Sequence, residues 1–301
     1  MRQDYGFVKN LENLNKKELV ILRKVPKGSH TDIILKESLK DREYPKKKLV
    51  KQDKVWMINS FLDVNKNLKE KCDGVILRSE FLLLRYLGNE KIKKENIADY
   101  LIFLKNKLSK KLPQKVIYRF CDYNNKDFDF LDNNFKSRGS RRLIEDEVLF
   151  NLDLKVVEFL LDEGIDVDIL IPYIIFSEDF VILKDMIKSR NNGLKVGMMV
   201  EVPSNILEIE KFSSSDFFVF GPGDILSNLY GGINRSNPEF NKIDEKIVIP
   251  LVSLSLKKIN SMSVKKKIYL VKNLIGKFSD YSNIDFIDTY MPAQLLEGKN
   301  L

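Results

Sequence analysis

Short apolar runs alternate with longer segments of helical periodicity from residue 55 onward. The runs are rich in Val, Ile and Phe, as buried parallel strands are. They lie at 55–59, 74–77, 116–120, 168–172, 195–200, 217–220, 267–271 and 285–290. Between them, residues 96–108 and 143–163 place apolar side chains three to four apart and are predicted helices, and Ser177 is a predicted N-cap of a third. This alternation predicts an α/β fold with a parallel sheet.

Eight such strands in the segment 55–301 predict a (β/α)8 TIM barrel, which typically needs ~250 residues. A doubly wound open sheet is the alternative, but no Gly-rich turn follows the first strand to support it. Residues 1–54 precede the first strand. The expected organisation is therefore a short N-terminal segment, 1–54, followed by a barrel domain, 55–301.

The positive charge is concentrated in that N-terminal segment. The chain of 301 residues has a net charge of +8, and residues 1–54 contribute 12 Lys and three Arg against eight acids. Their bases are not interleaved with aromatic residues, so a solvated lysine-rich surface is favoured over nucleic-acid binding. No apolar run approaches the ~18 residues of a membrane span, and no secretory signal is visible. We therefore expect a cytoplasmic protein that does not enter membranes.

Arginines gather at the predicted strand ends. The chain has 11 Arg against 40 Lys, yet five arginines follow strands or lie in the loops after them, namely Arg78, Arg119, Arg138, Arg141 and Arg235. A guanidinium group binds carboxylate and phosphate oxygens with two parallel hydrogen bonds. The pattern favours a small anionic ligand with a phosphate group. The alternative is that these arginines pair with neighbouring acids such as Glu80 and Asp122.

Two acids follow consecutive apolar strands. Glu201 comes directly after the fifth run, and Asp224 comes four residues after the sixth. Carboxylate oxygens from adjacent strand ends, with room for water and substrate oxygens, suit Mg²⁺. A salt bridge to a base on a neighbouring strand is an equally good interpretation of the spacing.

Five segments in order resemble a known family. They are Asp73-Gly-Val-Ile-Leu-Arg78-Ser-Glu80-Phe81, Val116-Ile-Tyr-Arg119-Phe-Cys-Asp122, Arg138-Gly-Ser-Arg141, Met198-Met-Val-Glu201-Val-Pro-Ser204 and Gly221-Pro-Gly-Asp224 through Gly232-Ile-Asn-Arg235. Together they resemble the phosphoenolpyruvate-binding barrel of phosphoenolpyruvate synthase, pyruvate phosphate dikinase and Enzyme I of the sugar phosphotransferase system. The resemblance covers roughly residues 55–295.

The resemblance implies a role for each motif residue. Arg78, Arg119 and Arg138 would hold the phosphoryl group, and Arg235 would help to bind the carboxylate. Glu201 and Asp224 would ligate Mg²⁺. The implied activity is phosphoryl transfer involving phosphoenolpyruvate or pyruvate, with a homodimer formed through the barrel and a separate phosphocarrier protein as a further partner.

Two departures from the family bear on catalysis. Gly223 is a candidate substrate-binding residue at the position where the family has Asn, so the side-chain amide of that Asn is lost. The family's Cys-Gly pair after the seventh strand, whose cysteine protonates the enolate carbon, is missing. Lys272 falls at or next to that position and is the candidate substitute acid, although an ordinary surface lysine is the favoured interpretation.

The chain has one histidine, His30. The segment Gly28-Ser-His30-Thr-Asp-Ile33 resembles the phosphohistidine motif of the family's swivelling domain, which makes His30 a candidate catalytic phosphocarrier in a severely shortened remnant. No ATP-grasp domain fits in the chain, so a complete synthase or dikinase is excluded. The function hypotheses are an enzyme or enzyme subunit, favoured by the retained arginines and acids, and a binding or regulatory module that lost its proton donor. Nucleic-acid binding ranks a distant third.

Overall fold

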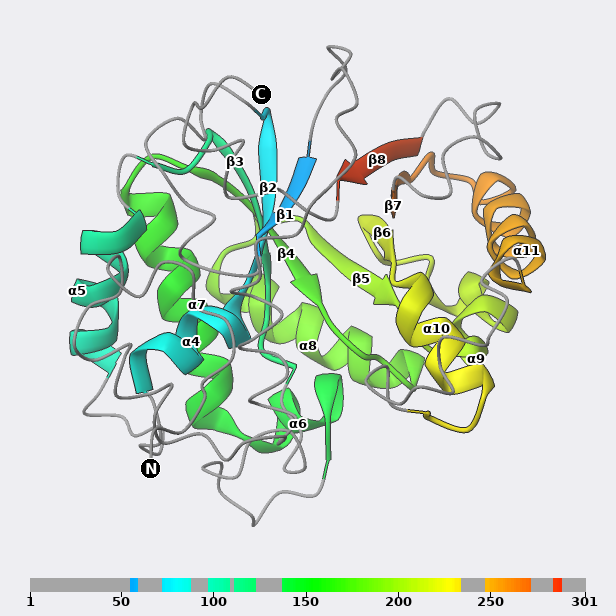
Figure 1. The fold of residues 1–301 in the computed structure, drawn as a ribbon, viewed down its shortest axis with the longest axis horizontal. Coiled ribbons are helices and arrows are strands. Elements are labelled where there is room, and N and C mark those ends of the chain that lie inside the picture. Colours follow the sequence, from blue (N-terminus) through cyan, green and yellow to red (C-terminus); the bar gives the residue numbers. More distant parts are fainter. Residues whose placement is uncertain are drawn as a thin grey trace, which may run out of the picture.

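The computed structural model describes residues 55–58, 72–87, 97–108, 111–122, 137–233, 247–271 and 284–288. Within this part of the chain, eight strands pair in parallel (Figure 1). They are β1 (Val55–Ile58), β2 (Gly74–Arg78), β3 (Lys115–Arg119), β4 (Asp166–Ile171), β5 (Val196–Val200), β6 (Phe217–Phe220), β7 (Lys267–Val271) and β8 (Ile284–Asp288). The parallel α/β class predicted from the sequence is confirmed.

The strands pair in sequence order, and β1 also pairs with β8 through Val55 with Ile287 and Trp56 with Asp288. This closes the sheet into a barrel. Parallel pairing brings the carboxyl ends of all strands to one side, where (β/α)8 enzymes carry their chemistry. The completion of all eight βα units stays a prediction, because the segments after β1, β7 and β8 lie outside the described residues.

Helices follow the middle strands and cover the outside of the sheet. They are α4 (Ser79–Leu87), α5 (Ile97–Leu108), α6 (Gly139–Glu145), α7 (Glu147–Asp162), α8 (Ser177–Arg190), α9 (Pro203–Leu207), the short 3-10 helix η4 (Ile209–Phe212), α10 (Pro222–Leu229) and α11 (Val248–Asn260). Figure 1 shows α4, α5 and α7 together on one side, and α9, α10 and α11 on the other. Among the described helices, none combines the length and the hydropathy that a membrane-spanning segment needs.

The buried side chains form two layers. Between the sheet and the helices lies a large apolar core to which Val116, Phe120, Val156 and Leu160 belong. A smaller cluster has side chains from the strands β2 to β7, two of them from β6: Ile76, Ile117, Leu170, Met199, Phe217, Val219 and Tyr269. Burying both faces of each strand explains why the apolar runs in the sequence are continuous rather than alternating.

The structure corrects two details of the predicted helices. The segment 143–163 is not one helix: α6 ends at Glu145, and α7 begins after Asp146, whose carboxylate accepts a hydrogen bond from the N–H of Leu149 at 3.1 Å. An N-cap carboxylate of this kind starts a new helix. Ser177 is the first residue of α8 rather than its cap, and its hydroxyl donates to Glu178 instead.

Candidate active site

Arg78 and Arg119 are the last residues of β2 and β3 and are partners in the strand register. Both contact Oε1 of Glu80, from the first turn of α4: Arg78 Nε lies 2.8 Å away, and Arg119 NH2 pairs with the same oxygen. Burial and the neighbouring charge of Arg119 lower the pKa of Arg78. One buried carboxylate therefore holds two guanidinium groups side by side.

Arg119 links this pair to the end of β5. Its NH1 lies 3.6 Å from Oε1 of Glu201, the residue that follows the strand. Both side chains are almost fully buried. Burial opposes the charge of Arg119, but the carboxylates of Glu80 and Glu201 outweigh that cost and raise its pKa above the usual value.

Arg138 binds Asp122 through both of its carboxylate oxygens. Nε donates to Oδ1 and NH2 donates to Oδ2, each at 2.9 Å. The guanidinium carbon also lies 3.9 Å from the ring centroid of Tyr173, which is a cation–π distance. Burial opposes the charge of Arg138, but Asp122 outweighs it and raises the pKa. The side chain keeps 32% of its surface exposed, so its outer edge remains accessible.

Gly139 allows the chain after Arg138 to approach the β4 end closely. It has a φ of +59°, and a Cβ at this position would come within 2.3 Å of the carbonyl oxygen of Tyr173. Glycine tolerates this φ, and the missing side chain leaves space for the carbonyl. The Arg138-Gly139 pair of the sequence motif is therefore explained by packing against Tyr173.

Glu201 is held from two sides. Its Oε2 accepts the backbone N–H of Tyr173 at 2.9 Å, and Gly221 packs so closely that a Cβ there would lie 2.8 Å from Cγ of Glu201. Burial, and after it the charge of Asp224, raise the pKa of Glu201. Two carboxylates thus repel one another here, and the burial of one of them favours its neutral form.

Asp224 and Gly223 lie in the first turn of α10, after β6. Asn228, one turn later, connects this helix to Glu201: its Nδ2 donates to the carbonyl oxygens of Asp224 at 2.9 Å and of Glu201 at 3.1 Å. Asn228 had no signal in the sequence, because its contacts depend on how α10 lies against the β5 end.

The structure thus brings together five of the predicted site residues. With their acidic partners they form an arginine–carboxylate cluster of Arg78, Arg119, Arg138, Glu80, Asp122, Glu201 and Asp224. Gly223 lies beside it in α10. Arg141 does not join it and pairs instead with Asp179 and Glu145. The predicted residues His30, Arg235 and Lys272 lie outside the described part of the chain.

The sequence left two interpretations of these arginines, a bound anion or pairing with neighbouring acids. The structure shows the pairing, of Arg78 and Arg119 with Glu80 and of Arg138 with Asp122. This pairing does not preclude a ligand. Three arginines face four carboxylates, so the cluster has one net negative charge when all are ionised. An anion alone would be repelled, whereas a divalent cation would make the cluster net positive.

A cation held by the two candidate metal ligands, Glu201 and Asp224, would keep open positions for water and substrate oxygens. No group of three or more His, Cys, Asp or Glu side chains in the described ranges is arranged to hold a metal. Mg²⁺ is commonly bound by one or two carboxylates and completes its shell with water and substrate oxygens. The repulsion between Glu201 and Asp224 is what such a cation would relieve.

A second, buried polar group lies beneath the cluster and was missed in the sequence. Asp153 of α7 is fully buried and accepts hydrogen bonds from the hydroxyl of Tyr118 at 2.8 Å and the N–H of Cys121 at 2.7 Å. The thiol of Cys121 contacts Ser79 and Asp153 and is buried, and burial raises its pKa well above the usual range. Cys121 is therefore part of the support of the β3 end and not a reactive thiol.

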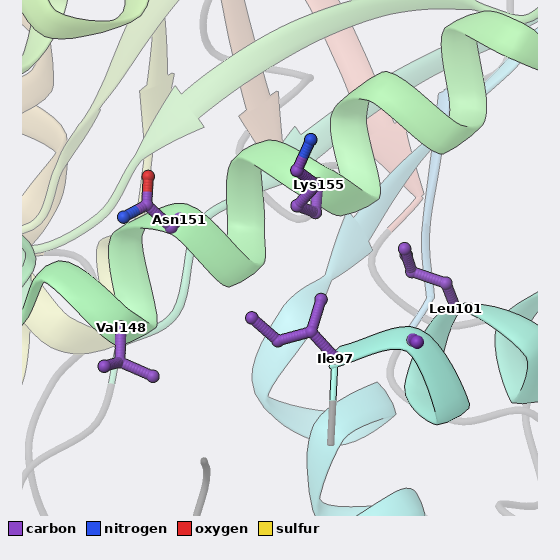
Figure 2. Close-up of a pocket in the computed structure, with 6 residues that line it drawn as sticks. Ile97, Leu101, Val148, Asn151 and Lys155 are labelled. Carbon is purple, nitrogen blue, oxygen red and sulfur yellow. The ribbon is translucent and has the colours of Figure 1, made fainter. Parts of the chain in front are cut away.

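A groove of about 490 Å³ lies elsewhere, between α5 and α7. Figure 2 shows the groove residues Ile97 and Leu101 on α5 beside α7, which contributes Val148, Asn151 and Lys155 to the lining. The lining is mostly apolar, and Lys155 is paired with Glu158. The groove contains none of the predicted site residues.

Comparison with known proteins identifies one matching family. The sequence model described as the PEP-binding domain of PEP-utilising enzymes matches residues 36–272. This segment includes Arg78, Arg119, Arg138, Glu201 and Asp224. A search of curated proteins gives no match.

Several solved structures are distantly similar. They include a citrate synthase variant (13% identity, TM-score 0.45, 78% of this chain and 86% of that one) and the citrate lyase beta subunit of M. tuberculosis complexed with oxaloacetate and magnesium (11% identity, TM-score 0.41, 80% and 92%). A HpcH/HpaI aldolase/citrate lyase family protein from Burkholderia cenocepacia is similar at 12% identity and a TM-score of 0.43, over 81% of this chain and 90% of that one.

Proposed function

The chain belongs to the PEP-utilising enzymes through their PEP-binding domain, and we propose that it binds phosphoenolpyruvate or pyruvate with Mg²⁺ at the arginine–carboxylate cluster and takes part in phosphoryl transfer. The observation that carries the proposal is the meeting of three arginines with Glu201 and Asp224 at the carboxyl ends of neighbouring strands. Completion of the (β/α)8 barrel by the remaining segments belongs to the same proposal.

The roles of the arginines follow from their exposure. Arg78 and Arg138 keep 25% and 32% of their side chains exposed and would bind phosphate oxygens directly, while the buried Arg119 fixes Glu80 and Glu201. Phosphoryl transfer develops negative charge on phosphate and enolate oxygens, which guanidinium groups stabilise. Bound Mg²⁺ would supply further charge neutralisation between Glu201 and Asp224.

The net charge of the cluster gives the proposal a sharp consequence. Phosphoenolpyruvate is an anion, and the cluster has no net positive charge without a metal, whether Glu201 is ionised or neutral, so tight binding should require Mg²⁺. Isothermal titration calorimetry with and without Mg²⁺ tests this. We expect Glu201→Gln and Asp224→Asn to remove the Mg²⁺ dependence while the protein stays folded.

Exposed acids on α7 provide matched controls. Glu158→Gln and Asp162→Asn make the same chemical changes far from the cluster and should leave binding unchanged. Arg138→Lys keeps the charge but loses the two-point fork, and should weaken binding about 10–100-fold, whereas Arg190→Lys at the exposed end of α8 should not. Binding that is equally tight without Mg²⁺ would reject the metal site, and no binding in either condition would reject the proposal.

A binding or regulatory module is the second candidate function. It is favoured by the sequence after β7, where the family's Cys-Gly pair is missing and Lys272 falls at or next to the cysteine position, and by Gly223 in place of Asn. This candidate shares the ligand and differs in turnover. The separate phosphocarrier, the homodimer and the cytoplasmic location remain predictions.

A further inference from the structure

Tyr173 has an unusual backbone conformation at the end of β4. It lies two residues after the strand and has a φ of +41°, the one positive φ of a non-glycine residue in the described ranges. Such a conformation is strained for a bulky side chain and persists where the surroundings enforce it. Here its N–H donates to Oε2 of Glu201, and its carbonyl oxygen accepts the N–H of Ser140 at 3.4 Å.

The side chain of Tyr173 contacts both Arg138 and Asn228. Its ring lies under the guanidinium of Arg138, at 3.9 Å from the centroid. Its hydroxyl donates to Oδ1 of Asn228 at 3.0 Å. That bond fixes the amide so that Nδ2 faces the carbonyl oxygens of Glu201 and Asp224.

One residue therefore contacts the phosphate-binding arginine and, directly or through Asn228, both carboxylate residues. We propose that Tyr173 is a positioning residue that sets the placement of Arg138 relative to Glu201 and Asp224, so that a phosphate group and a metal ion can bind side by side at the same time. This rests on the proposed function of the cluster. The family resemblance assigns no role to Tyr173 or to Asn228, so the coupling is argued from the contacts of these two residues alone.

Tyr173 makes two contacts that can be removed separately. Its hydroxyl bond to Asn228 is the metal arm, also called the Asn228 arm, and the packing of its ring on Arg138 is the phosphate arm. Tyr173→Phe removes the hydroxyl and leaves the ring under Arg138 and the N–H on Glu201. Asn228 then loses the donor that orients it, so we expect metal affinity to fall about 5–10-fold. The affinity for phosphoenolpyruvate at saturating Mg²⁺ should fall less than twofold. Tyr173→Leu also removes the ring, and should weaken phosphoenolpyruvate at saturating Mg²⁺ about 10-fold.

Mn²⁺ titration followed by electron paramagnetic resonance measures the metal arm without any substrate. Calorimetry with phosphoenolpyruvate at saturating Mg²⁺ measures the phosphate arm. Tyr230→Phe, an exposed tyrosine at the end of α10, is the matched control and should change neither. A merely structural role would lower the thermal midpoint and shift both affinities together, so the split between the two arms is the decisive readout.

The outcomes distinguish this inference from the proposed function. If the wild type binds Mn²⁺ but not phosphoenolpyruvate, the proposed function is rejected, while the Mn²⁺ comparison still tests the Asn228 arm. If Tyr173→Phe leaves Mn²⁺ affinity unchanged, or lowers both affinities equally, the positioning role is overturned. A wild type that binds neither probe overturns both.

Discussion

Arg138 donates two hydrogen bonds of 2.9 Å to Asp122, from Nε and NH2, and leaves its exposed outer edge for the proposed phosphate group. The pair orients the guanidinium, because Asp122 is nearly buried and the ring of Tyr173 lies against the arginine. It also adds a negative charge beside the proposed anion site. Asp122 therefore both prepares and opposes ligand binding.

The charge of Asp122 can be removed with little change of shape. Asp122→Asn keeps an oxygen acceptor for Nε of Arg138 and removes one negative charge from the cluster. We expect phosphoenolpyruvate to bind about 5–10-fold more tightly in the absence of Mg²⁺, since one repulsive charge near the ligand is lost. The gain from adding Mg²⁺ should shrink correspondingly.

Calorimetry with and without Mg²⁺ measures both effects. Asp166→Asn is the control, because Asp166 begins β4 at the opposite end of the barrel and pairs there with Lys115. Weaker binding of Asp122→Asn in both conditions would show that orientation of Arg138 outweighs the charge.

The strand ends were predictable because a parallel barrel leaves a strong record in the sequence. Continuous apolar runs mark strands that are buried on both faces, and β6 and β7 have the predicted bounds. A charged residue that closes such a run, such as Arg119 or Glu201, must lie at the strand end. The convergence of these residues follows from the parallel order of the strands.

Contacts that depend on three-dimensional placement were harder to predict from the sequence. Tyr173 sits in an apolar context, and nothing in its sequence neighbours indicates a positive φ. Asp153 did leave a signal: it lies on the apolar stripe of α7 with Leu149, Val156 and Leu160, where an acid needs a buried partner. The interruption at Asp146 was missed because helical periodicity continues across it.

Asp153 gives the folded protein a specific pH dependence. Burial raises its pKa from 3.8 to about 7, so the folded state holds the proton more tightly than the unfolded chain. The corresponding stability is present below about pH 4 and is lost as the pH rises through about 7. The loss amounts to at most roughly 4 kcal/mol in the free energy of unfolding.

Asp153→Asn removes this titration while it keeps a polar group of the same size beside Tyr118. We expect the free energy of unfolding of the variant to fall less than that of the wild type between about pH 4 and pH 8. Urea unfolding across this range is the measurement, with Asp162→Asn, an exposed site on the same helix, as the control. Parallel profiles for wild type and Asp153→Asn would contradict the assignment.

His30 is the single histidine of the chain, so a phosphohistidine formed in this protein has one possible location. Incubation with labelled phosphoenolpyruvate and Mg²⁺ should give a label that is stable to base and labile to acid. His30→Ala should abolish the label and leave calorimetric binding of phosphoenolpyruvate intact. A wild type that binds the ligand without acquiring label would exclude an autonomous phosphocarrier role for His30.

Protonation of the enolate carbon separates the two candidate functions. The family's cysteine after the seventh strand is absent, and general acid catalysis typically contributes ~10²–10⁴-fold. We therefore expect exchange of the pyruvate methyl protons with solvent, followed by NMR in deuterated buffer, to be slow or absent even where phosphoenolpyruvate binds. Fast exchange would instead point to a substitute donor, with Lys272 as the first candidate, and Lys272→Met should then stop exchange and spare binding. Exchange that survives Lys272→Met would reject Lys272 as the donor and leave the enzyme hypothesis standing with another acid. Tight binding of phosphoenolpyruvate with neither exchange nor phosphoryl transfer to a carrier would identify a binding module.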